Sequence, residues 1–113
     1  MKFSKKLLEH LGYYVYALID PFDKKIFYVG KASGNNRAFN HLKKSKQESK
    51  KSKRIEDIRA RKLEPIIEIL RYGLASEQQA FDVEAAVIDT IGLENLTNQV
   101  RGHGVEKGRL SIK

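Results

Sequence analysis

The most regular pattern of apolar and polar positions in the chain runs over residues 76–91. Apolar side chains recur there at intervals of three and four residues, which is the spacing of one face of an α-helix. Ser76 and Gln79 form a capping box at the start of this segment, and Gly92 is placed to end it. The pattern therefore predicts an amphipathic helix over 76–91.

Two short segments, 13–19 and 26–30, are rich in the aromatic and β-branched residues typical of β-strands. The Asp-Pro-Phe-Asp sequence between them is typical of a turn, so the two segments predict a β-hairpin. Because side chains alternate along a strand, Tyr16 lies on one face of the first strand and Tyr28 on one face of the second. Whether those two faces coincide depends on the register of the hairpin, which the sequence leaves open.

The rest of the chain gives weaker patterns that complete the expected fold. They predict a leading helix over 1–11, a helix over 37–44 and another contained within 50–62. They also predict a third strand over 65–72 and a mainly irregular segment over 93–113. The apolar residues of the third strand do not alternate cleanly, which indicates partial burial on both of its faces. This order of elements predicts a single α/β (α+β) domain over 1–113, with a small three-stranded, mainly antiparallel sheet flanked by helices.

Composition narrows the chemistry that is open to the chain. The 113 residues are 41% hydrophobic and 32% charged, which suits one core under an ionic surface. There is no cysteine, so disulfides, thiolate metal sites and cysteine nucleophiles are excluded, and oxygen or imidazole ligands would hold any metal. Residues 1–11 are too charged for a signal peptide, and no apolar run is long enough to cross a membrane. We therefore expect no membrane partner and a cytoplasmic location.

Most of the positive charge is concentrated in one stretch of the chain. The net charge is +8 and the pI is about 9.7, and residues 43–62 hold ten lysines and arginines against three acidic residues. A solvated loop explains such a run as well as a binding surface does, and charge alone suits nucleic acid, an anionic membrane or an acidic protein. The residues expected to contact an anionic partner are Lys43, Lys44, Lys46, Lys50, Lys51, Lys53 and Arg54.

Glu84 is the most informative single residue of the sequence. Its neighbours three and four positions away on the predicted helix are Ala80, Phe81, Val87 and Ile88, which are all apolar. A carboxylate within an apolar stripe needs a partner, because removing the ion from water costs several kcal/mol. An ion pair with an arginine or lysine and coordination of a metal ion both meet that need, and this residue alone does not decide between them.

Four further side chains are candidates for chemistry in the same region as Tyr16. A catalytic tyrosine needs a nearby cation, because the pKa of a free phenol is about 10, and Lys31 follows Tyr28 closely enough to supply one. Arg37 opens the next predicted helix and is able to fork onto a phosphate or a carboxylate, and His41 lies one turn later on the same face. Taken one at a time, these residues are better explained as packing tyrosines, a surface arginine and a packing histidine.

Taken together, these residues form an ordered set that resembles the GIY-YIG nuclease family. The first motif stands as Tyr14-Val15-Tyr16 and the second as Tyr28-Val29-Gly30, followed by Lys31, Arg37, His41, a helical Glu84 and Asn98. The resemblance spans about residues 13–98. Further matches at 17–21 and 96–104 are similar to one branch of the family, which includes the animal nucleases with ankyrin repeats and a LEM domain and small stand-alone bacterial relatives.

The resemblance implies a DNA endonuclease with a three-stranded antiparallel sheet and one divalent ion, Mg²⁺ or Mn²⁺. The family's metal ligand maps to Glu84, its motif tyrosines to Tyr16 and Tyr28, its arginine to Arg37 and the lysine after the second motif to Lys31, while Asn98 and His41 match polar positions near the site. Tyr28 is the favoured general base, with Lys31 lowering its pKa, and Tyr16 and His41 are the alternatives.

The chain departs from the family pattern in two places. Tyr14 stands where the first motif has glycine. The interval from Tyr28 to Arg37 is one residue shorter than in excision-repair relatives, so Arg61 and Arg101 compete with Arg37 for its role.

Two other classes of function compete with the nuclease. One is a catalytically inactive nucleic-acid-binding module of the same fold, and the other is a structural or protein-interaction domain in which Glu84 pairs with an arginine. For the nuclease we expect DNA as the partner, branched or structured DNA as the favoured substrate, and a monomer or weak dimer. DNA repair and DNA recombination are the candidate pathways.

Overall fold

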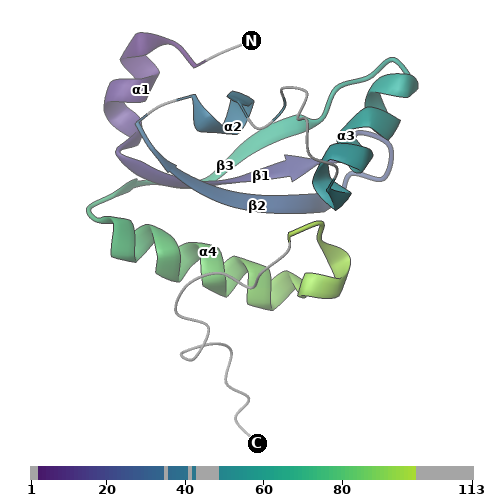
Figure 1. Cartoon of the computed structure of the whole chain (residues 1–113). Coiled ribbons are helices and arrows are strands. Elements are labelled where there is room, and N and C mark those ends of the chain that lie inside the picture. Colours follow the sequence, from purple (N-terminus) through teal and green to yellow (C-terminus); the bar gives the residue numbers. More distant parts are fainter. Residues whose placement is uncertain (1–2, 35, 41, 43–48, 99–113) are drawn as a thin grey trace, which may run out of the picture.

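The computed structural model describes residues 3–34, 36–40, 42 and 49–98 of the chain (Figure 1). Its elements in chain order are α1 (Lys5–Leu11), β1 (Tyr13–Ile19), β2 (Ile26–Ser33), α2 (Arg37–Asn40), α3 (Lys50–Ala60), β3 (Ile66–Leu74), α4 (Glu77–Ile91) and a short 3₁₀ turn, η1 (Leu93–Asn95). The three strands form one sheet in the order β2-β1-β3, and both strand pairs are antiparallel. The predicted α+β fold, with a three-stranded antiparallel sheet flanked by helices, is confirmed.

The sheet separates two layers of helices. In Figure 1, α4 covers one face of the sheet, while α1, α2 and α3 lie on the other. β1 is the central strand, and its side chains alternate, so they pack against the helices on both faces of the sheet. Tyr14 and Tyr16 pack in a core with Ile58 of α3, and Val15 packs in a second core with Ile88 of α4. The side of the sheet that carries the two motif tyrosines is therefore the side of α2 and α3.

Serine side chains cap the described helices of more than one turn. The hydroxyl oxygens of Ser4, Ser49 and Ser76 accept hydrogen bonds from backbone N–H groups at the starts of α1, α3 and α4. Such caps satisfy donors that have no partner within the helix. Gly92 follows the last residue of α4 with a φ of 96°, which explains why the helix ends there. The two boundaries of the helix predicted over 76–91 are thus confirmed to within one residue.

β2 and β3 differ most from the predicted boundaries. β2 continues to Ser33, beyond the predicted end at residue 30, because it stays paired with β1 along its whole length. The pairing of β3 with β1 shifts register on both sides of Val15. Ile67 packs against one core and Leu70 against the other, so the predicted partial burial on both faces is confirmed.

The helical segments differ from the predictions at their ends. The structure describes the helix predicted over 37–44 as Arg37–Asn40. α3 lies within the segment 50–62 that was predicted to contain a helix, and it stops before Lys62, which takes a positive φ of 65°. None of the helices in the described part of the chain is long and apolar enough to span a membrane.

Candidate active site

The register of the hairpin brings the two motif tyrosines to one face of the sheet. Tyr16 pairs with Gly30 and Leu18 pairs with Tyr28, so Tyr16 and Tyr28 are diagonal neighbours on the same side. Their ring centroids are 6.3 Å apart and their planes are inclined by 43°. Tyr16 is 0% exposed, whereas Tyr28 is half-buried. The two faces that the sequence left unrelated therefore coincide.

Gly30 allows the ring of Tyr16 to lie across β2. A Cβ atom at residue 30 would lie 2.6 Å from both Cζ and Oη of Tyr16. Atoms do not approach so closely without displacing one another, so the phenol end of Tyr16 occupies the space that any larger residue would need. The glycine of the second motif is thus required by a neighbouring side chain rather than by its own backbone conformation.

Glu84 and Arg37 bring opposite charges to the two phenols. Glu84 is half-buried on α4, within the apolar stripe that the sequence predicted, and Arg37 begins α2. Burial is the largest influence on the pKa of Tyr28 and raises it, the Glu84 carboxylate raises it further, and the Arg37 guanidinium lowers it. The same two charges act in the same directions on the pKa of Tyr16, which burial raises most strongly. Both charged groups are therefore close enough to each phenol to shift its pKa.

Lys31 occupies a different place from the one expected. Residues 28 and 31 lie an odd number of positions apart on one strand, so their side chains leave β2 on opposite faces. The Lys31 ammonium lies 4.0 Å from the ring centroid of Phe81 and 3.6 Å from a carboxylate oxygen of Glu77, both on α4. The pKa of Tyr28 is raised rather than lowered, and the cation that acts on it is Arg37. The expectation that Lys31 lowers the pKa of Tyr28 is therefore wrong.

Asn98 and Thr97 hold the outer edge of β2. The Asn98 side chain accepts a hydrogen bond from the Val29 N–H at 3.0 Å and donates one to the Val29 carbonyl at 2.7 Å. The Thr97 backbone N–H and hydroxyl both donate to the Phe27 carbonyl, at 2.7 and 2.8 Å. These bonds replace those of a missing neighbouring strand and fix the backbone on both sides of Tyr28. Asn98 thus positions the strand that carries the tyrosine, and Thr97, which the sequence analysis missed, assists it.

Lys51 of α3 lies against the ring of Tyr28, although the sequence suggested only a general contact with an anionic partner. Its Nζ atom is 4.8 Å from the ring centroid of Tyr28, and the residue is half-buried. Burial first, and then the positive charge of Arg37, lower the pKa of Lys51 below its ordinary value. The sequence contained a signal for this position: the helical spacing from Lys51 to the buried Ile55 and Ile58 indicates that all three lie on the sheet-facing side of α3. We call the group formed by Tyr16, Tyr28, Arg37, Lys51 and Glu84 the tyrosine cluster.

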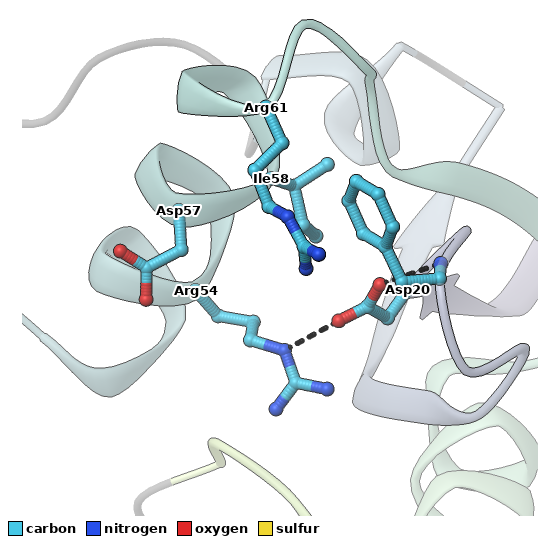
Figure 2. Close-up of a pocket in the computed structure, with 6 residues that line it drawn as sticks. Asp20, Arg54, Asp57, Ile58 and Arg61 are labelled. Carbon is cyan, nitrogen blue, oxygen red and sulfur yellow. Dashed lines mark hydrogen bonds and ion pairs between the residues drawn. The ribbon is translucent and has the colours of Figure 1, made fainter.

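Arg54, another expected contact for an anion, is bound instead to the turn between β1 and β2. Its Nε atom lies 2.8 Å from a carboxylate oxygen of Asp20, as Figure 2 shows, and its Nη2 atom lies 3.3 Å from Asp23. Burial alone would raise the pKa of Asp20, but hydrogen bonds from the Phe22 N–H and from Arg54 outweigh it and hold that pKa below its ordinary value. The charge of Arg54 is therefore matched by two carboxylates, and its role in the structure is to fasten α3 to the hairpin.

A hollow of about 300 Å³ lies beside this ion pair and is separate from the tyrosine cluster. It is lined by Asp20, Phe22, Arg54, Asp57, Ile58 and Arg61 (Figure 2). The lining holds two arginines and two aspartates, so it offers no excess of positive charge. The Arg61 guanidinium lies 3.8 Å from the ring centroid of Phe22. Arg61, which the sequence offered as an alternative to Arg37, is thus directed to this hollow. Arg37, and not Arg61, belongs to the tyrosine cluster.

Several of the expected site residues lie outside the part of the chain that the structure describes. These are His41, Lys43, Lys44 and Lys46, together with the competing Arg101. Lys50 and Lys53 are described, and both are exposed on α3.

Glu84 is the candidate metal ligand of the tyrosine cluster. Within the described residues, no group of three or more histidine, cysteine, aspartate or glutamate side chains is arranged to hold a metal ion. Mg²⁺ is typically bound by one or two carboxylates and keeps several water ligands, with substrate phosphate oxygens completing its shell. A single carboxylate whose charge acts on both phenols therefore fits a hard divalent ion of this kind, and it does not fit a closed structural site.

A three-stranded antiparallel sheet that gathers two tyrosines, an arginine and a glutamate is the arrangement expected of a GIY-YIG nuclease domain. The family model described as the LEM-3-like GIY-YIG domain matches residues 8–111, and the chain belongs to this family. GIY-YIG domains are nuclease domains that generally use divalent metal ions. No curated protein and no solved structure matches the chain.

Proposed function

We propose that this chain is a metal-dependent DNA endonuclease that hydrolyses phosphodiester bonds. The observation that carries the proposal is the meeting of Tyr16, Tyr28, Arg37 and Glu84, which come from β1, β2, α2 and α4. A structural ion pair would require only Glu84 and one cation. A site for an anionic substrate would add further groups, and here these are the buried phenol of Tyr16, the half-buried phenol of Tyr28 and a second cation, Lys51.

Glu84 would hold one divalent ion, with water and phosphate oxygens as its other ligands. When bound, Mg²⁺ or Mn²⁺ would polarise the phosphate and stabilise the negative charge of the leaving oxygen. A mechanism with two metal ions is disfavoured, because the cluster contains a single carboxylate.

The protein side chains would divide the remaining tasks. As water attacks phosphorus and the bond to the leaving oxygen breaks, Arg37 would stabilise the charge that builds on the phosphoryl oxygens. Tyr28 is the proposed acceptor of the water's proton, because it is partly exposed and is subject to the opposite charges of Glu84 and Arg37, whereas Tyr16 is fully buried. Tyr16 would then orient the site by hydrogen bonding, and His41 is the alternative base.

Exposed lysines of α3 would hold the DNA backbone. Lys50 and Lys53 are both exposed, and contacts of this kind position a substrate without reading its sequence. The proposed substrates are branched or structured DNAs, as in repair or recombination. A monomer with one such site would cut one strand at a time, so a double-strand break would require a weak dimer or two encounters.

The test is cleavage of a panel of labelled DNAs: a four-way junction, a flap, a plain duplex and a single strand. Each is incubated with Mg²⁺, Mn²⁺ or EDTA at several salt concentrations. We expect divalent-ion-dependent cleavage, strongest on the branched substrates, and DNA affinity that falls steeply with salt. Salt-dependent binding without cleavage of any substrate, with either ion, would identify the chain as an inactive binding module instead.

A further inference from the structure

Lys51 is a charged residue at a position where α3 otherwise buries apolar side chains. It precedes the buried Ile55 by four residues and the buried Ile58 by seven, so all three share the face that packs on the sheet. Its side chain is half-buried, and its ammonium lies 4.8 Å from the ring centroid of Tyr28. Removing an ammonium from water is unfavourable, so this placement requires a compensating interaction.

The surroundings of Lys51 compensate that charge only in part. The ring face of Tyr28 attracts a cation weakly. Arg37 acts in the opposite direction, because its positive charge adds to burial in lowering the pKa of Lys51. Two neighbouring cations repel each other, and an anion bound close to both Lys51 and Arg37 would relieve that repulsion.

Two other cations that pack against the sheet or the hairpin, Arg54 and Lys31, are matched by carboxylates. Arg54 pairs with Asp20 and Asp23, and Lys31 pairs with Glu77. Among the residues that the structure describes, no hydrogen bond or ion pair joins Lys51 to an acidic side chain. Lys51 is therefore available to an anionic ligand in a way that these two residues are not.

We propose that Lys51 is a further catalytic residue, whose ammonium binds a non-bridging oxygen of the scissile phosphodiester beside Arg37. This inference rests on the proposed nuclease function. Lys51 neither gives nor takes a proton in the reaction. Water forms the new bond to phosphorus, the bond to the leaving sugar oxygen breaks, the base takes the water's proton, and Lys51 remains an ammonium throughout. Its contribution is positive charge next to oxygens that become more negative in the transition state.

The first test compares Lys51→Met, which keeps an unbranched apolar stem, with Lys51→Arg and Lys53→Met. Lys53 lies on the same helix but is exposed, so it is the matched control for loss of one lysine from the basic stretch. Single-turnover cleavage is measured at saturating branched DNA with Mn²⁺, and affinity is measured separately. We expect Lys51→Met to lower the saturated rate by about 100-fold or more with little change in affinity, and Lys51→Arg to restore most of it. Lys53→Met should mainly weaken affinity, and it should lower the saturated rate far less than Lys51→Met does.

A second arm separates charge from packing. Because the chain contains no cysteine, Lys51→Cys creates a unique thiol. Alkylation with bromoethylamine restores an ammonium at nearly the same distance, whereas iodoacetamide adds a neutral group of similar size. The proposal expects rescue by the first reagent and none by the second.

Two outcomes would overturn this inference, and they are distinguishable from failure of the proposed function. If the wild-type chain cleaves and folded Lys51→Met cleaves at the same saturated rate, Lys51 is not catalytic while the nuclease assignment stands. Equal rescue by both alkylating reagents would likewise show that Lys51 acts by packing. If the wild-type chain binds DNA but never cleaves it, both proposals fall together.

Discussion

The hydroxyl end of Tyr16 occupies the space in which a side chain at residue 30 would begin. A Cβ atom on Gly30 would meet Cζ and Oη of Tyr16 at 2.6 Å. The tyrosine of the first motif and the glycine of the second are therefore one structural unit, although fourteen positions separate them in the sequence. The hairpin register creates this unit by pairing the two residues directly across β1 and β2.

Gly30→Ala should destabilise the fold and impair cleavage, because the added methyl group must displace the phenol of Tyr16. The expected loss is about 1–3 kcal/mol in the free energy of unfolding, which is the usual penalty of overpacking. Denaturant unfolding and single-turnover cleavage measure the two effects. Gly73→Ala is the control, because its Cβ would meet nothing within 4 Å and only its φ of 70° opposes the substitution. Wild-type stability and cleavage in Gly30→Ala would contradict the close packing of the Tyr16 phenol on residue 30.

Tyr14→Phe should weaken the attachment of α2 to the sheet. Tyr14 is fully buried and forms a hydrogen bond with the backbone of Ala38, which directly follows Arg37. Loss of that bond should lower the free energy of unfolding by about 0.5–1.5 kcal/mol. Misplacement of Arg37 should slow cleavage by about tenfold or more. Tyr13→Phe, on the opposite face of the same strand, should leave the rate unchanged, and equal rates in the two variants would refute the role of Tyr14.

The cleavage rate should rise with pH if Tyr28 is the general base. Burial, and then the Glu84 carboxylate, raise the pKa of Tyr28, so the phenol is almost entirely protonated at neutral pH. Its ionised fraction then increases about tenfold for each unit of pH below that pKa. Single-turnover rates between about pH 6 and 9 should follow this increase, and Tyr28→Phe should lower and flatten the profile. An unchanged slope in Tyr28→Phe would assign the base to another group.

Asp20→Asn should destabilise the protein at neutral pH, because Asp20 accepts hydrogen bonds from Arg54 and from the Phe22 N–H. We expect a loss of about 1–3 kcal/mol, as for other hydrogen bonds to charged groups. The pKa of Asp20 is lower in the folded than in the unfolded chain, so its contribution is fully present at pH values above the unfolded pKa of about 4 and is lost progressively as the pH falls from there through the folded pKa. Urea unfolding at pH 7 and at pH 3 should therefore give a smaller difference between variant and wild type at the lower pH. A difference that does not depend on pH would rule out the ion pair as its source.

Local sequence patterns correctly predicted those properties of the fold that depend on one helix or one strand alone. The alternation of β1 predicted which of its residues share a face, the capping box and Gly92 predicted the bounds of α4, and helical spacing predicted the apolar surroundings of Glu84. Each of these properties depends on neighbours close in the chain, so the sequence is sufficient to determine them.

The parts of the site that the sequence did not reveal depend on contacts between distant segments. The pairing of Arg54 with Asp20 joins residues 34 positions apart, and the bonds of Asn98 to Val29 join residues 69 positions apart. Lys31 was misplaced although the alternation of β2 indicates its face, because closeness in sequence was taken for closeness in space. Lys51 was assigned to a basic surface because the helix and the sheet face that meet at Tyr28 are related only by the tertiary fold.

The central claim is that the Glu84 carboxylate holds the ion on which cleavage depends. The most direct measurement is single-turnover cleavage of branched DNA by Glu84→Gln, with DNA affinity and Mn²⁺ binding measured on the same samples. Asp82→Asn, an exposed acid of the same helix, serves as the control. We predict that Glu84→Gln loses cleavage and Mn²⁺ binding but keeps its affinity for DNA, while Asp82→Asn keeps all three. Cleavage by Glu84→Gln at the wild-type rate would contradict the account.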